Sequence, residues 1–125
     1  PKDILKFYKN FQICIAPYEN KVSVKNNSDT SKFMSPLKIF EYMASNKIIL
    51  CSDHSVLKEV LINEHNSILL NYNDTKSWLH AIQKISKNIE YSKKISSNAY
   101  SDFKKKYSWD LRVKKITQTF NYLDL

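Results

Sequence analysis

Three short, mainly apolar segments stand out from the polar stretches around them. They are Phe11–Ala16, Lys47–Cys51 and Ser67–Leu70. Short apolar runs that end at turn residues, as the first does at Pro17, are typical of strands. Because these runs are continuously apolar rather than alternating, they fit strands that are buried on both faces of a parallel sheet. We therefore predict three buried parallel strands.

Between and after these runs, apolar residues recur at the spacing of amphipathic helices. The predicted helices cover Ile4–Tyr8, Pro36–Ser45, Val56–Ile62, a segment around Trp78, Leu79, Ile82 and Ile85 that Asp74 caps, a segment from Ile89 to Lys106, and a last one from Ser108 onward. Alternating strands and helices imply crossover connections. The expected fold is therefore doubly wound α/β, a parallel sheet with helices on both faces.

The predicted sheet is small, and its size bears on the extent of the domain. A chain of 125 residues in which 42% are hydrophobic fits a single domain, residues 1–125, with one core. Three strands leave a sheet edge that a complete domain normally pairs or covers. We expect the missing strands upstream, and the start at Pro1 rather than Met leads us to expect a piece of a longer protein.

The formal charge of +8 has two interpretations. Clustered Lys and Arg attract phosphate, nucleic acid or anionic lipid. Alternatively, abundant Lys, Asn, Ile, Ser and Tyr together with an absence of Gly reflect the bias of an AT-rich genome acting on surface positions. The basic residues near the C-terminus have the same two interpretations, a solvated face or a contact with anionic lipid head groups. They are Lys104, Lys105, Lys106, Arg112, Lys114 and Lys115.

Cysteines, histidines and apolar run lengths limit the classes of protein. Cys14 and Cys51 both lie in apolar runs, where Cys behaves as a small buried hydrophobe, and we expect no disulfide. Three histidines without a Cys-x-x-Cys pair are too few ligands for zinc, so we expect no metal. No apolar run is long enough to cross a bilayer and no signal peptide is visible. We expect a cytoplasmic chain, with peripheral contact at the inner face of the membrane left open.

The segment 35–44 holds the most informative chemistry. Ser35 is a good N-cap and Pro36 suits the first helical position, so free backbone amides at this helix start attract phosphate. Leu37 follows, and Lys38 adds a positive charge there. Glu41, three residues later on nearly the same face, is placed to accept hydrogen bonds from ribose hydroxyls. The alternative is that Lys38 and Glu41 form an ordinary solvated ion pair, and their spacing alone does not decide between the two.

Residues outside this segment have more modest interpretations. The polar stretch 20–31 is predicted to be a loop at the carboxyl end of the first strand, where the ligand crevice of such a sheet lies. Asp53 and His54 also follow a strand, and a capping role is favoured over acid–base chemistry. Trp78 and Trp109 are predicted to be core anchors rather than stacking platforms for bases.

Several motifs of the sequence resemble those of one known protein family. The resemblance rests on Ser-Pro-Leu-Lys-Ile-Phe-Glu-Tyr-Met-Ala at 35–44, Ile-Ile-Leu-Cys-Ser-Asp at 48–53 and Glu-Val-Leu at 59–61. Weaker matches follow at 66–70, at Asp74, Trp78 and Ala81-Ile82, at Asn98-Ala99 and at 107–109. These segments are similar to the donor-site region of family 4, or group 1, glycosyltransferases of the GT-B fold, and they cover nearly the entire chain.

The resemblance implies a Rossmann-like C-terminal domain that binds a nucleotide diphosphate sugar and faces an N-terminal acceptor domain across a cleft. Glu41 matches the second Glu of the family's Glu-x7-Glu motif, which holds the ribose hydroxyls, and residues 35–38 match the helix start beside the diphosphate. Members usually retain anomeric configuration and need no metal. The implied enzyme acts in bacterial polysaccharide biosynthesis, with a glycan or lipid-linked saccharide as acceptor and no nucleic acid partner.

Two departures from the family pattern limit this expectation. Phe33 stands where the first Glu of the motif belongs, and Phe cannot hydrogen-bond a donor sugar. The family's phosphate-binding Arg and Lys belong to an upstream loop that this chain lacks. We therefore expect no catalysis by the isolated chain. A noncatalytic binding domain on the same fold is the alternative, because fold alone does not fix function.

Overall fold

The computed structural model describes Tyr8, residues 10–19 and residues 37–121. Its strands are β1 (Ile13–Ala16), β2 (Ile48–Ser52) and β3 (Ile68–Leu70). Its helices are α2 (Leu37–Ala44), α3 (Thr75–Lys87), α4 (Ile89–Asp102) and α5 (Trp109–Asn121), with a 3-10 turn η2 (Leu57–Glu59) and a π-helical turn η3 (Phe103–Tyr107). The predicted helix at 4–8 lies mostly outside the described residues.

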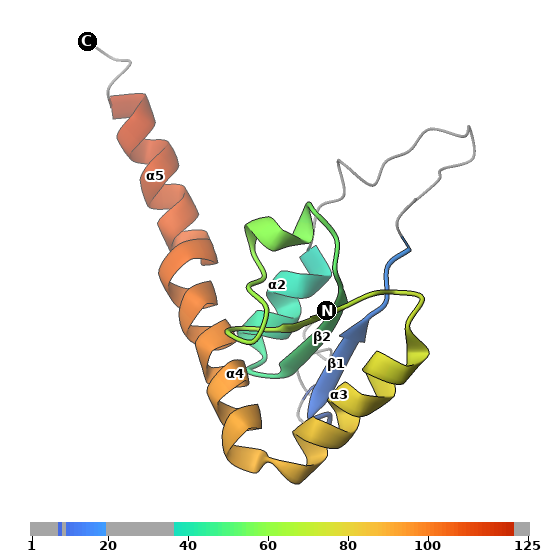
Figure 1. The fold of residues 1–125 in the computed structure, drawn as a ribbon. Coiled ribbons are helices and arrows are strands. Elements are labelled where there is room, and N and C mark those ends of the chain that lie inside the picture. The colour runs from blue at the N-terminus through green and yellow to red at the C-terminus, as the bar shows by residue number, and fades with distance from the viewer. Residues whose placement is uncertain (1–7, 9, 20–36, 122–125) are drawn as a thin grey trace.

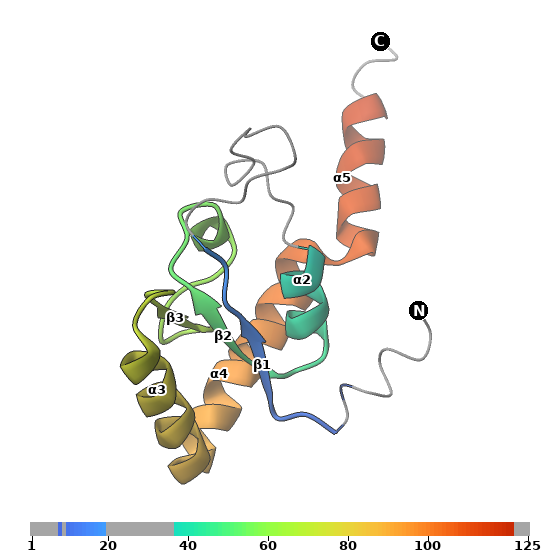
Figure 2. The ribbon, with the colours of Figure 1, turned by 90° about the vertical axis from the view of Figure 1, so that its right-hand side faces the viewer.

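The three strands form one parallel sheet in the order β1-β2-β3. Ile13 lies opposite Ile48, and Leu50 lies opposite Ile68. All five residues of β2 are buried, as a central strand covered on both faces requires. Helices cover both faces, with α3 on one side of the sheet and α2 and α4 on the other (Figures 1 and 2). The predicted fold class is confirmed.

Side chains of β2 alternate between two apolar clusters, one on each face of the sheet. Ile49 and Cys51 pack with Ile39 and Met43 of α2. Their neighbours Ile48 and Leu50 pack in the second cluster with Ala81 and Ile85 of α3. Helix α4 contributes Ala99 to the first cluster and Ile95 to the second. This two-sided packing holds α2 against the sheet and thereby fixes which of its faces points outward.

Two helix boundaries depend on Asn rather than on the absent Gly. Asn46 follows α2 with φ at 54°, the left-handed conformation that ends many helices, and its N–H donates to the carbonyl of Met43 at 3.1 Å. Asn88 caps α4, because its side-chain oxygen accepts from the N–H of Tyr91 at 2.9 Å. Asp74 caps α3 in the same way through the N–H of Ser77, as predicted. Local polar side chains therefore set these ends.

The predicted helix Val56–Ile62 is wrong, since only η2 forms there. Leu57 and Leu61 are buried at 0% and 1% exposure, so their spacing reflects packing into the core rather than a continuous helix. The N–H of Ile62 donates to the side chain of Asn66 at 2.7 Å instead of to a helical carbonyl. That side-chain bond diverts the backbone from the helix.

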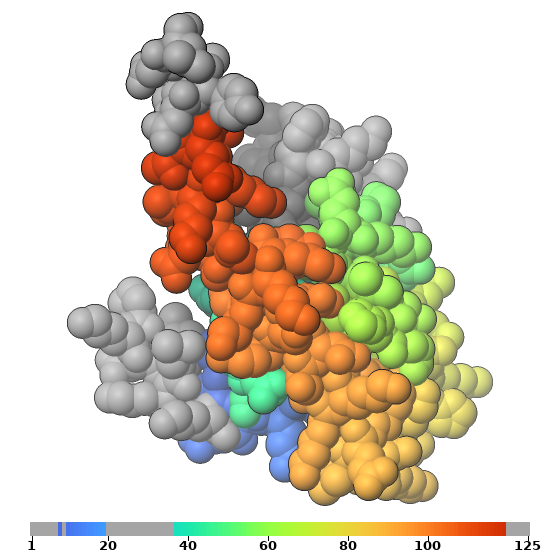
Figure 3. All heavy atoms as spheres, turned by 90° about the vertical axis from the view of Figure 1, so that its left-hand side faces the viewer, coloured from blue at the N-terminus to red at the C-terminus, as the bar shows by residue number. Residues whose placement is uncertain are grey.

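Helix α5 extends away from the rest of the fold and contacts it chiefly through η3 (Figures 1 and 2). The space-filling view shows the same helix rising beyond the body formed by α4 and the segment 57–67 (Figure 3). None of the described helices combines the length and apolar character needed to cross a membrane.

Candidate functional site

The outward face of α2 presents two of the predicted donor-site residues. Ile39 and Met43 are fully buried against the sheet. Lys38 and Glu41 are consequently exposed on the opposite side of the helix, and Leu37 is 65% exposed. This arrangement leaves a cation and a carboxylate one helical turn apart on an accessible surface. Ser35 and Pro36, the other predicted site residues, lie outside the described residues, as do Phe33 and the predicted loop 20–31.

Glu41 has a polar partner that its sequence neighbours do not suggest. The hydroxyl of Tyr8 donates to Oε2 of Glu41 at 3.4 Å, although the two residues are 33 positions apart. The Glu41 carbonyl accepts from Ser45, from its hydroxyl at 2.7 Å and from its N–H at 3.0 Å. No ion pair between Lys38 and Glu41 forms in the part of the chain that the structure describes. The Glu41 carboxylate is thus exposed, and one of its oxygens accepts a hydrogen bond from Tyr8.

Two tyrosines beside Glu41 form a compact aromatic pair. The rings of Tyr8 and Tyr42 meet edge to face, with centroids 5.8 Å apart and planes at 80°. Burial raises the pKa of Tyr42 to about 12. Burial, followed by the negative charge of Glu41, also raises the pKa of Tyr8. Both hydroxyls therefore keep their protons at neutral pH, and Tyr8 remains a hydrogen-bond donor.

A groove of about 440 Å³ lies beside this surface, between α2, η3 and α5. Its apolar lining includes Phe40, whose ring packs on Tyr107 with centroids 5.1 Å apart. Leu37 and Glu41 of α2 also line it, together with Arg112 of α5. A volume in this range suits a small ligand. A larger cavity of about 550 Å³ lies between β3 and α3, on the other face of the sheet from α2.

Asp53 and His54, for which the sequence suggested a capping role, directly follow β2. Asp53 forms an ion pair with Lys58 at 2.6 Å, and its N–H donates to the carbonyl of Leu70 at 2.8 Å. The carbonyl of His54 accepts from the N–H of Leu57 at 3.0 Å and so opens η2. The His54 side chain is 6% exposed. Neither side chain caps η2, whose N-cap is Val56 without a side-chain bond, and Nδ1 of His54 is buried without a hydrogen-bond partner among the described residues. The predicted capping role is therefore not observed.

The two tryptophans have different environments. Trp78 packs against the second apolar cluster and donates its indole N–H to the carbonyl of Asn71 at 2.9 Å, so its predicted core role is confirmed. Trp109 is 74% exposed, and its predicted core role is wrong. The physical reason is that Trp109 begins α5, which extends away from the sheet, so its side chain lines the groove beside α2 and η3 and enters neither apolar cluster. Arg112 lies over the indole ring at 5.8 Å instead.

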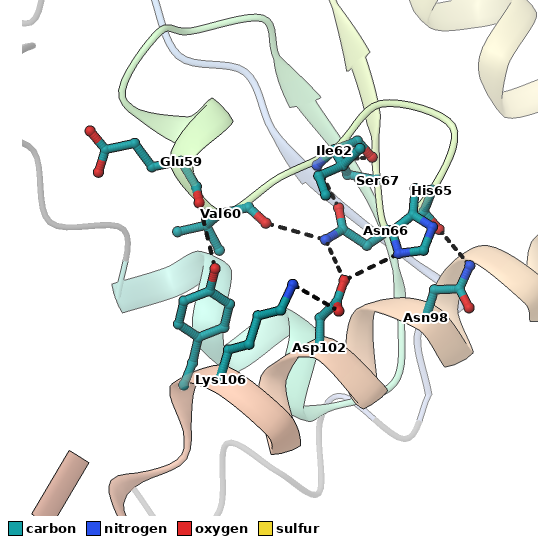
Figure 4. A network of polar contacts seen from close by, with 10 residues as sticks. Glu59, Val60, Ile62, His65, Asn66, Ser67, Asn98, Asp102 and Lys106 are labelled. Atoms are coloured by element: carbon teal, nitrogen blue, oxygen red, sulfur yellow. Dashed lines mark hydrogen bonds and ion pairs between the residues drawn. The ribbon is translucent and has the colours of Figure 1, made fainter. Parts of the chain in front are cut away.

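A second polar cluster fastens the loop after η2 to α4 (Figure 4). Asn66, which is 1% exposed, donates to Asp102 Oδ2 at 3.0 Å. Nε2 of His65 lies 3.4 Å from the same oxygen, and Lys106 lies 3.4 Å from the other one. Although burial alone raises the pKa of Asp102, the Asn66 hydrogen bond and the Lys106 charge lower it overall. Because its polar groups are turned toward one another, this cluster stabilises the fold rather than exposing a reactive group.

The described residues offer no group of three or more His, Cys, Asp or Glu side chains that is arranged to bind a metal. The available chemistry at α2 is therefore that of a helix start, a cation, a carboxylate and an aromatic neighbour.

Comparison with known proteins gives one family and one fold. Residues 2–102 match the family described as glycosyl transferases group 1. Comparison with curated proteins gave no match.

Solved structures with this fold include two from larger chains. One is the C-terminal domain of a glycosyl transferase group 1 family protein (LpcC) from Francisella tularensis, at 16% identity and a TM-score of 0.66. The other is sucrose-phosphate synthase from Thermosynechococcus elongatus, at 18% identity and a TM-score of 0.72. The match covers 86% of this chain and 49% of that C-terminal domain, and 94% of this chain and 26% of the sucrose-phosphate synthase chain. At these identities the likeness shows the fold alone, and this chain spans half or less of either protein.

Proposed function

This chain belongs to the group 1 glycosyltransferases, and from that premise we propose that it forms part of the donor site of a sugar transferase. The donor is a nucleotide diphosphate sugar, and the acceptor is a glycan or a lipid-linked saccharide. The reaction retains anomeric configuration. An N-terminal domain, absent from this chain, binds the acceptor, so the isolated chain is expected to bind a nucleotide without transferring sugar.

The observation that supports this proposal is the orientation of α2. Burial of Ile39 and Met43 turns Lys38 and Glu41 outward together. Amides at a helix start and a nearby cation favour a diphosphate, because the helix dipole and orphan N–H groups attract anions. We assign Ser35, Pro36, Leu37 and Lys38 to the diphosphate and Glu41 to the ribose hydroxyls. The diphosphate is the leaving group, and fixed donors stabilise the charge that develops on it.

A nucleotide titration tests this assignment. Addition of UDP or GDP to the 15N-labelled chain is expected to shift the amide signals of residues 37–41 more than those of α3. Glu41→Gln keeps the size of the side chain but removes its charge. Charged hydrogen bonds contribute about 1.5–3 kcal/mol each, so we expect this variant to weaken nucleotide binding roughly 10- to 100-fold.

Glu90→Gln is the matched control, because Glu90 is also an exposed carboxylate but lies in the first turn of α4, outside the segments that resemble the donor site. We expect nucleotide affinity to be unchanged in it. Shifts confined to other parts of the chain, or equal losses in the two variants, would refute the site. Inorganic diphosphate and single-stranded DNA serve as competing polyanions, and a donor domain should prefer the nucleoside diphosphate to both.

A noncatalytic binding domain of the same fold is the alternative function. Both functions predict nucleotide binding by this chain, so the distinction needs the whole protein. Release of nucleoside diphosphate from a nucleotide sugar by the full-length protein supports the transferase, and tight binding without release supports the alternative.

Peripheral contact with the membrane at its cytoplasmic face is a second part of the proposal. The supporting observation is the surface of η3 and α5, where Trp109 is 74% exposed and Val113 is 54% exposed among six basic residues. Exposed aromatic residues flanked by Lys and Arg suit the interface of an anionic bilayer. Such a contact would bring the donor site to a lipid-linked acceptor.

Vesicle sedimentation tests this contact. We expect the chain to bind vesicles rich in phosphatidylglycerol and to leave neutral phosphatidylcholine vesicles unbound. The double substitution of Lys114 and Lys115 by Ala should weaken binding, while the same substitutions at Lys93 and Lys94 of α4 should have less effect. Equal losses from the two pairs would indicate a diffuse effect of net charge and would contradict a specific surface.

A further inference from the structure

Tyr8, which precedes β1 in the sequence, contacts two neighbouring residues of α2. Its hydroxyl donates to Oε2 of Glu41 at 3.4 Å. Its ring rests edge to face on Tyr42, one residue beyond Glu41, with centroids 5.8 Å apart. The aromatic contact limits the rotation of the Tyr8 ring and so keeps the Tyr8 hydroxyl near the Glu41 carboxylate.

The carboxylate that receives this bond would otherwise be free to rotate. Glu41 is exposed, and a glutamate side chain on a helix surface samples several rotamers. A ribose presents two neighbouring O–H donors, the 2′- and 3′-hydroxyls, which a carboxylate accepts best when both of its oxygens face them. Holding the side chain in one rotamer before the ligand arrives reduces the entropy lost on binding.

The Tyr8 bond leaves capacity for a ligand on the same group. An ionised carboxylate has two oxygens with about four lone-pair positions in all. One of these accepts from Tyr8, and the others remain able to accept from a diol. The backbone of the same residue has a further partner, because the Ser45 hydroxyl donates to the Glu41 carbonyl at 2.7 Å. Backbone and side chain of Glu41 are thus both held by neighbours.

We propose that Tyr8 is a positioning residue that orients the Glu41 carboxylate toward the 2′- and 3′-hydroxyls of the donor ribose. This inference rests on the proposed function, in which Glu41 is the ribose ligand. Tyr8 does not touch the nucleotide in this arrangement and acts only through Glu41. Its effect should therefore depend on the ribose hydroxyls being present.

That dependence gives a test that general structural damage would not mimic. Affinities for UDP and for 2′,3′-dideoxy-UDP are measured by calorimetry for the wild-type chain and for Tyr8→Phe. Phe keeps the ring on Tyr42 and removes only the hydroxyl. We expect Tyr8→Phe to weaken UDP binding roughly 2- to 10-fold, the range of a single hydrogen bond, and to leave the dideoxy ligand unaffected. If the wild-type chain prefers GDP, the guanosine pair replaces the uridine pair.

Two further variants complete the comparison. Tyr42→Phe is the matched control, since it removes a neighbouring hydroxyl for which the structure shows no bond to Glu41, and it should change neither affinity. Glu41→Gln should lose most of the preference for UDP over the dideoxy ligand. Adding Tyr8→Phe to Glu41→Gln should then cause no further loss, because the residue through which Tyr8 acts is already altered.

The outcomes separate this inference from the proposed function. An unchanged UDP preference in Tyr8→Phe overturns the inference while leaving Glu41 as the ribose ligand. Equal weakening of both ligands also overturns it, since that result indicates a structural role for Tyr8. A wild-type chain without preference for UDP over the dideoxy ligand, or a Glu41→Gln variant that keeps the preference, refutes the proposed ribose site itself and the inference with it.

Discussion

Replacement of Asn66 by Ala is expected to destabilise the fold severely. Asn66 is 1% exposed and makes three hydrogen bonds with its side chain. Its oxygen accepts from the N–H of Ile62 at 2.7 Å, and its nitrogen donates to the carbonyl of Val60 at 3.2 Å and to Asp102 at 3.0 Å. The substitution removes all three, so that the N–H of Ile62 and the carbonyl of Val60 lose these partners (Figure 4).

The magnitude follows from the kinds of bond that are lost. A neutral hydrogen bond contributes about 0.5–1.5 kcal/mol net and one to a charged group about 1.5–3 kcal/mol. Two bonds of the first kind and one of the second give a loss of about 2.5–6 kcal/mol in the free energy of unfolding. Domains are typically stable by about 5–15 kcal/mol, so this change removes a large share. The corresponding fall in Tm is roughly 10–20 °C.

Urea unfolding followed by far-ultraviolet circular dichroism measures the loss. Asn98→Ala is the matched control, because its side chain joins α4 to the same loop by only one bond, from its nitrogen to the carbonyl of His65 at 3.0 Å. We expect about 0.5–1.5 kcal/mol for that variant, with a similar dependence on urea concentration in both. Equal stability of the Asn66 and Asn98 variants would refute the view that Asn66 is the centre of this network.

Three other predictions concern stability and reactivity. The hydrogen bond from Tyr91 lowers the pKa of Glu64 in the folded protein. The ionised Glu64 side chain therefore stabilises the fold above the ordinary glutamate pKa, and this contribution is lost as the pH falls through the lowered pKa of the folded state. Tyr91→Phe should accordingly lose less stability than wild type when thermal melts are compared at about pH 6 and about pH 3; parallel losses would contradict this. Trp78→Ala should lower the free energy of unfolding in urea by about 2–4 kcal/mol, whereas Trp109→Ala, at a 74% exposed position, should lower it by under about 1 kcal/mol. The reverse order would show that α5 packs against the rest of the fold in solution. Burial raises the pKa of Cys51 to about 12, so thiol reagents at neutral pH should label it only after unfolding, and rapid labelling of the native chain would contradict its burial.

Local pattern was enough to predict the sheet and most of the helices. The segment Lys47–Cys51, continuously apolar from Ile48 onward, predicted a strand covered on both faces, and β2 is buried along its whole length. The Asp74 cap was predicted from residue type and position alone, because a capping side chain bonds to the backbone only three residues away. The resemblance at 35–44 predicted the family that residues 2–102 match.

Where local pattern failed, a distant partner or its absence decided the outcome. Apolar spacing at 56–62 predicted a helix, but Asn66 takes the N–H of Ile62 and leaves only a short turn. Trp109 has the spacing of a core residue, yet it begins a helix that extends away from the sheet and remains 74% exposed. Periodicity indicates which face of a helix is apolar without indicating what covers that face.

The sequence by itself determined the α/β alternation, the placement of Lys38 and Glu41 on nearly the same face of one helix, and the family. Only the tertiary structure decided that Tyr8 meets Glu41 across 33 positions and that Asn66 meets Asp102 across 36. The reason is physical. Helical and strand periods arise from backbone geometry within a few residues, whereas these contacts exist only after packing on the sheet has brought separate segments together.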